Sequence, residues 1–107
     1  MESRYIVVLI TVPTPEEGRK IAEHLVENKL AACVNILPSI QSCYIWDGKT
    51  NLDQEILLLV KTRADLFEDR IIPAVQALHP YELPEIIALP IVLGSQRYLE
   101  WIESETV

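Results

Sequence analysis

Basic charge, glycine and cysteine are all scarce in this sequence, and each shortage argues against a class of protein. The 107 residues hold nine Lys and Arg against sixteen Asp and Glu, giving a net charge of −7. A nucleic-acid partner is therefore not expected, because a phosphate backbone needs a basic face. The three glycines form no Gly-rich phosphate loop. The two cysteines, Cys33 and Cys43, lie too far apart on one predicted strand for a disulfide.

Long hydrophobic runs are also absent. The run Tyr5–Val12 is too short to span a bilayer and is not followed by a signal-peptide cleavage pattern. We therefore expect no membrane partner and a cytoplasmic location. Half of the residues are apolar, which is typical of a packed protein, and the length predicts a single domain over residues 1–107.

The apolar periodicity predicts four strands and three helices. Thr14, Pro15 and Glu17 form a strong helix start, in which Thr14 caps the helix and Pro15 takes its first position. Pro73 falls inside a helical pattern, so we expect a kink or a weakened turn there. The expected elements, in order, are strand 5–12, helix 15–28, strand 31–46, strand 49–62, helix 64–78, strand 85–91 and a short helix from 95.

A long hairpin is expected around Asp47-Gly48, because a type I′ turn needs positive φ at both central positions. Each arm has about 14–16 residues, or roughly 50 Å, whereas a small domain is about 30 Å across. We expect a bulge at Pro38, a break of the second arm at 51–53, and a hairpin that projects beyond its own domain.

The element order βαββαβ plus a terminal helix predicts an α+β, ferredoxin-like sandwich. In that topology the second and fourth strands are edges, and these strands hold Pro38 and Pro90, which is where a sheet tolerates proline. Two open edges and an overlong hairpin invite aggregation unless copies of the chain cover them. We therefore predict a homo-oligomer.

The segment 79–85, HPYELPE, packs an imidazole, a phenol and two carboxylates between two prolines. One hypothesis makes His79 a metal ligand, with Glu82 and Glu85 nearby, and Cu²⁺ or another divalent cation as its partner. The alternative is a capping or hydrogen-bonded histidine, since the dipole at a helix C-terminus favours imidazolium and opposes metal binding.

Aromatic and polar side chains along the hairpin and the corner suggest a second site, a ligand pocket between subunits. Aromatics with convergent polar groups suit small-molecule sites, but oligomer interfaces use them equally. An interface is the better interpretation, with a pocket as a secondary consequence. The candidate residues are Tyr44, Trp46, Lys61, Tyr81, Glu82 and Glu85.

Catalysis is not expected. The sequence has no nucleophile elbow and no pair of metal ligands at helical spacing. The loop 13–17 after the first strand holds two prolines and two carboxylates, so it is unsuited to cradling an anion.

Several motifs together resemble the CutA divalent-cation tolerance family, in order over nearly the whole chain. The motifs are AACVN at 31–35, YIWDGK at 44–49, KT at 61–62, HPYELPE at 79–85 and YLEW at 98–101. The resemblance implies a ferredoxin-like fold, a homotrimer joined by strand pairing between subunits, and a link to tolerance of copper and other divalent metals.

One departure from that family bears on metal binding. Copper ligation in some members uses a cysteine near the end of the first strand and a His-His pair before the proline. Here those positions are Ile10 and Leu78, so only His79 remains of the set. The resemblance therefore implies a metal-tolerance protein without the full set of copper ligands.

Two other functions stay open. A trimeric sensor of nucleotide-type small molecules would need basic residues, for which Lys49 and Lys61 are candidates, although the acidic balance counts against a phosphate ligand. A purely structural trimer, which anchors partners and binds no ligand of its own, is the other.

Overall fold

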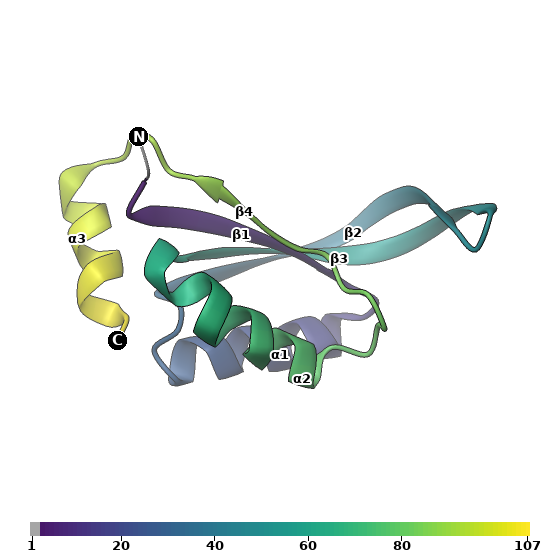
Figure 1. Cartoon of the computed structure of the whole chain (residues 1–107), viewed down its shortest axis with the longest axis horizontal. Coiled ribbons are helices and arrows are strands. Elements are labelled where there is room, and N and C mark those ends of the chain that lie inside the picture. Colours follow the sequence, from purple (N-terminus) through teal and green to yellow (C-terminus); the bar gives the residue numbers. More distant parts are fainter. Residues whose placement is uncertain (1–2) are drawn as a thin grey trace.

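The computed structural model in Figure 1 describes residues 3–107. Its elements follow the expected order and are β1 (Tyr5–Val12), α1 (Pro15–Glu27), β2 (Cys33–Trp46), β3 (Lys49–Arg63), a 3₁₀ turn (Ala64–Leu66), a π-helical turn (Phe67–Ile71), α2 (Ile72–Leu78), β4 (Ile86–Pro90) and α3 (Gln96–Glu105). None of the described helices has the length and apolarity needed to cross a membrane.

The four strands form one antiparallel sheet in the order β2-β3-β1-β4. This is the strand order of the predicted βαββαβ sandwich. The proline-free strands β1 and β3 are central, whereas β2 and β4, which hold Pro38 and Pro90, are the edges. The edge assignment made from proline is therefore confirmed. Helices α1 and α2 lie side by side along one face of the sheet, and α3 lies at its end (Figure 1).

The core lies between the sheet and helices α1 and α2. Alternate residues of the central strands, such as Val8, Ile10, Leu58 and Val60, are fully buried there. Period-two alternation sends their neighbours to the opposite side of the sheet. On that side α1 and α2 give no cover, and we call it the open face. Its members, by register, are Val7, Leu9, Leu57, Leu59, Lys61, Ile87 and Leu89.

The open face is largely apolar and only partly covered. Leu9 and Leu59 are half-buried, while Ile87 and Leu89 on the edge strand β4 remain 50% and 53% exposed. A contiguous apolar patch on the surface of a monomeric protein often marks an interaction site. The open face is therefore an apolar surface that α1 and α2 leave uncovered.

The β2–β3 hairpin extends well past the helices (Figure 1), as the arm lengths predicted. Asp47 and Gly48 have φ of 53° and 72°, which confirms the positive-φ turn. The molecule is 44 × 28 × 24 Å, with the hairpin along the long axis. The expected break at 51–53 is wrong: β3 pairs with β2 throughout that stretch, because every residue of it has a cross-strand partner.

The bulge expected at Pro38 is confirmed. The β2–β3 register shifts between Leu37 and Ile40, and Ser39 has a φ of 63°. Proline has no amide hydrogen to donate to the ladder, so an edge position with an irregular register is where it fits.

The helical segment before the corner is not one helix. A 3₁₀ turn and the π-helical turn Phe67–Ile71 precede α2, and Pro73 lies in the first turn of α2. Proline lacks the amide that an unbroken α-helix would use for its bond four residues back, so the chain widens before it. The weakened turn predicted from Pro73 is confirmed, and the structure shows its form.

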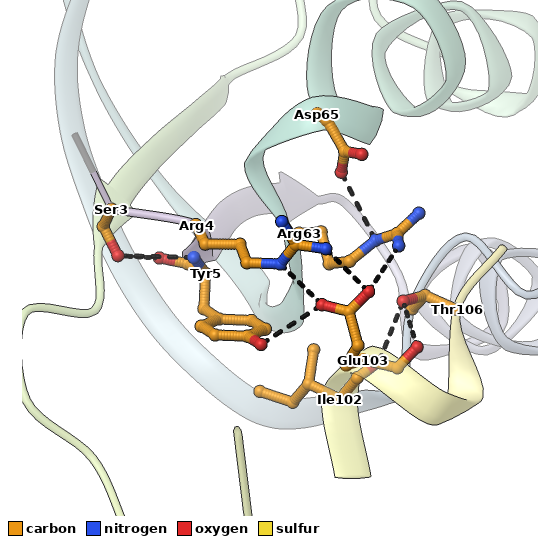
Figure 2. A network of polar contacts seen from close by, with 8 residues as sticks. All are labelled: Ser3, Arg4, Tyr5, Arg63, Asp65, Ile102, Glu103 and Thr106. Carbon is orange, nitrogen blue, oxygen red and sulfur yellow. Dashed lines mark hydrogen bonds and ion pairs between the residues drawn. The ribbon is translucent and has the colours of Figure 1, made fainter. Parts of the chain in front are cut away.

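Helix α3 is held to the sheet by a polar network around Glu103 (Figure 2). Its carboxylate accepts hydrogen bonds from Arg4 (2.6 and 2.9 Å), from Arg63 Nη1 (2.9 Å) and from the Tyr5 hydroxyl (3.1 Å). These donors lower the pKa of Glu103 from the ordinary 4.5 to about 2. Ile102, the residue before Glu103, is fully buried. The network and this side chain together fix α3 across the ends of β1 and β3.

Candidate functional site

His79 ends α2 and turns the chain toward β4. Its backbone is extended, with φ −82° and ψ 135°, as expected for a residue before proline. The side chain is only 8% exposed. Its Nε2 lies 2.7 Å from the Thr11 carbonyl oxygen, and its Nδ1 accepts a hydrogen bond from the Tyr81 amide at 3.1 Å. The imidazole therefore joins the end of β1 to the corner 79–85.

These two bonds fix the form of the imidazole. An amide can only donate, so Nδ1 of His79 carries no proton, and Nε2 donates to the carbonyl of Thr11. Both ring nitrogens are engaged, and a metal would displace one of these bonds. The role of His79 as a metal ligand stays a prediction.

Beside the corner, phenols and carboxylates from three segments form a group that we call the carboxyl–phenol cluster. The hydroxyl of Tyr81 donates to Glu55 Oε2 at 2.8 Å, across 26 residues of sequence. Glu55 lies on β3 and is 7% exposed. Burial, with the negative charge of Glu55, raises the pKa of Glu85. The cluster members are Tyr44, Asp53, Glu55, Tyr81 and Glu85.

The second phenol of the cluster comes from β2. The hydroxyl of Tyr44 donates to the carboxylate of Asp53, its neighbour on β3. That bond, more than burial, raises the pKa of Tyr44. Burial first, and then the bond to Glu55, raises the pKa of Tyr81. Both phenols thus stay protonated and act as donors to carboxylates.

The remaining predicted pocket residues lie elsewhere. Trp46 is at the hairpin tip, where it pairs with Lys49 and is half-exposed, and Glu82 is exposed in the corner. Lys61 donates to the side chain of Asn35 near the other end of β3. It is six residues from Glu55, about 20 Å along the strand. One chain therefore brings together Tyr44, Tyr81 and Glu85, and leaves the other three apart.

Two members of the cluster, Asp53 and Glu55, were missed by sequence reasoning. The available signal was a pair of acidic residues just before the apolar strand ILLLV. Their partner Tyr81 lies far along the chain, so only the tertiary fold connects them.

Ile10 and Leu78 stand at the two positions where the sequence lacks a copper ligand, and both are part of the apolar packing. Ile10 is fully buried in the core, and Leu78 packs against that core. Within residues 3–107 no group of three or more His, Cys, Asp or Glu side chains is arranged to hold a metal ion. The described part of one chain therefore offers no assembled group of three such ligands.

The fold and the cluster define a class of small α+β protein with an uncovered sheet face and a projecting hairpin. Residues 6–105 match the family described as CutA1 divalent ion tolerance protein. The chain belongs to this family, as its relatives also show.

Relatives match over nearly all of the chain. The divalent-cation tolerance protein CutA of Thermus thermophilus is 54% identical over 100 residues, which cover 94% of this chain and 96% of the relative. The chloroplastic CutA protein of Arabidopsis thaliana is 52% identical, again over 94% of this chain. The chain spans about half the length of the plant relatives, 55% for Arabidopsis and 56% for a rice protein.

Solved structures agree with the fold. The Cut A1 protein of Thermus thermophilus has a TM-score of 0.93 and 52% identity, covering 96% of this chain and 99% of that one. CutA1 from Oryza sativa also has a TM-score of 0.93, with 47% identity and coverage of 99% and 96%. The expected α+β architecture is thus that of known family members.

Proposed function

We propose that this chain works as a non-catalytic homotrimer in the tolerance of divalent metals, with Cu²⁺ the first candidate ion. Family membership supports the metal-tolerance role. The assembly is supported by one observation above all, the open apolar face flanked by two uncovered edge strands.

Self-association follows from the cost of leaving that surface in water. The edges β2 and β4 expose unpaired backbone groups, which template the addition of another strand. A head-to-tail contact between different surfaces of identical chains closes into a ring when its rotation allows. One edge of each copy can then meet the other edge of the next, and the trimer that we propose is a ring of this kind.

Metal binding, on this proposal, belongs to the assembled protein. No group of three ligating side chains is assembled within residues 3–107 of one chain. An ion held by several donors therefore needs side chains from more than one copy. His79 and the predicted pocket residues Tyr44, Trp46, Lys61, Tyr81, Glu82 and Glu85 are the candidates.

A structural trimer that binds no ligand is the second candidate. The occupied ring nitrogens of His79 favour it, because the imidazole already has a structural task. The nucleotide-sensor alternative has less support. Lys49 and Lys61 lie at opposite ends of β3, twelve residues or about 40 Å apart, so one chain cannot bring both to one phosphate group.

Two measurements test the proposal. Light scattering on the purified chain is expected to give three times the chain mass of 12.2 kDa, and a monomer at micromolar concentration would refute the assembly. Calorimetric titration with Cu²⁺ is then expected to show binding that weakens in His79→Ala and persists in His24→Ala, the only other histidine. Identical binding by both variants would remove His79 from the site.

The compartment has its own test. A cytoplasmic location is our expectation, whereas relatives bear the names chloroplastic and periplasmic. Fractionation of the source cells with an antibody to the chain would decide it.

A further inference from the structure

Glu55 is a buried carboxylate without a cation. It is 7% exposed, and its one hydrogen-bond donor among residues 3–107 is the hydroxyl of Tyr81. The ion pairs of the described residues involve Glu103 and Asp65, and none involves Glu55. A carboxylate removed from water usually has a counter-charge or several donors, because its lost hydration is costly. With one phenol donor and no cation, the carboxylate of Glu55 has acceptor capacity that the described residues leave unused.

The surroundings of Glu55 add negative charge. Glu85 is close enough for the charge of Glu55 to raise its pKa. Asp53 precedes Glu55 by two residues on the same side of β3. Its carboxylate already accepts the Tyr44 hydroxyl. Asp53, Glu55 and Glu85 therefore form an anionic region beside the apolar open face.

Lys61 shows the opposite imbalance on the same side of the sheet. It pairs across the sheet with Val7, and its neighbour in the open face is Leu59. Its ammonium donates to the neutral amide of Asn35, and it forms no ion pair with any described residue. At about 20 Å along β3, the ammonium of Lys61 cannot reach Glu55 of its own chain.

We propose that the ammonium of Lys61 pairs with Glu55 and Glu85 of a neighbouring copy when open faces meet. The inference rests on the proposed self-association and names a contact within it. Glu55 and the nearby Glu85 lie beside one end of the open face, and the ammonium of Lys61 lies near its other end. When copies pack head-to-tail, the end of one open face that carries Lys61 meets the end of the next that lies beside Glu55 and Glu85. Complementary charge of this kind fixes the register of an interface.

Lys49 provides a matched comparison. It lies on the same strand and the same side of β3 as Lys61, and it is also six residues from Glu55, in the opposite direction. It differs in its surroundings, because it is exposed at the hairpin tip, away from the open face. Lys61 is the lysine that contact between open faces would bury.

A double-mutant cycle tests the pairing. The oligomer dissociation constant is measured by sedimentation equilibrium for the parent, Lys61→Gln, Glu55→Gln and the double variant, in enough urea, an uncharged denaturant, to populate monomer. Each single change is expected to weaken association at least about tenfold. The double variant is expected to associate about as strongly as whichever single variant associates less strongly. Lys49→Gln is expected to leave association within about twofold.

The outcomes separate the pairing from the assembly. A monomeric parent would overturn the self-association and the pairing with it. An oligomeric parent with additive losses, with no losses, or with a larger loss for Lys49→Gln would overturn the pairing alone. Glu55→Gln keeps an acceptor for the Tyr81 hydroxyl, and circular dichroism of each variant checks folding. If that variant fails to fold, Glu85→Gln, which is partly exposed, takes its place in the same cycle.

Discussion

Replacing His79 by Ala should destabilise the fold even when no metal is present. The substitution removes the donor to the buried Thr11 carbonyl and the acceptor for the Tyr81 amide. Leaving a buried carbonyl unpaired costs about 1–3 kcal/mol, and losing an ordinary hydrogen bond costs about 1 kcal/mol. We expect the free energy of unfolding to fall by about 2–4 kcal/mol. Guanidinium denaturation at one fixed chain concentration, with EDTA present, measures it.

The other histidine supplies the control. His24 is a half-buried residue of α1 whose ring lies 3.3 Å from the side-chain amide of Asn28, so His24→Ala should change stability by less than about 0.5 kcal/mol. A loss below about 0.5 kcal/mol for His79→Ala would refute the structural role of the imidazole. If Cu²⁺ then stabilised the parent protein and not His79→Ala, the main role of His79 would be to bind the ion and not to stabilise the fold.

Three further predictions concern the framework. Because the fold lowers the pKa of Glu103, its carboxylate contributes stability that is complete above the unfolded pKa near 4.5 and is lost as the pH falls toward 2. Glu103→Gln should therefore flatten the plot of unfolding free energy against pH in that window, and an unchanged plot would contradict the network. Ile102→Ala should cost about 2–5 kcal/mol, because the side chain is fully buried, and a loss under about 1 kcal/mol would show that α3 is not anchored there. Gly48→Ala should cost about 1 kcal/mol by thermal denaturation through its positive φ alone, since nothing lies within 4 Å of an added Cβ, and no loss would contradict the turn geometry.

Local chemistry explains which features the sequence revealed. Proline marked both edge strands and the bulge, because a missing amide hydrogen has the same consequence in any sheet. Asp47-Gly48 marked the turn, because few residue pairs tolerate positive φ twice. Thr14 marked the start of α1, where its hydroxyl accepts the Glu17 amide at 3.3 Å. Each of these depends on residues close together in the chain.

The carboxyl–phenol cluster depends on distant residues and was only partly predicted. Tyr81 was a candidate, but its partner Glu55 was not, since their contact arises from the packing of the corner against β3. Lys61 was grouped with Tyr81 by residue type, and the register of β3 separates them. The π-helical turn also went unrecognised, because Pro73 predicts a disturbed helix without specifying which wider turn relieves it.

The projecting hairpin has a consequence for the time course of folding. Beyond the bulge after Leu37, its two arms form hydrogen bonds with each other and extend past the ends of the helices (Figure 1). An isolated two-stranded ribbon is marginal in water. In a lone chain its amides would exchange with solvent by local fraying, while those of β1 would wait for global unfolding. Slow hydrogen exchange at the hairpin would therefore appear only after chains associate. The rate at which this protection appears should rise with protein concentration, which would identify association as the last step of folding.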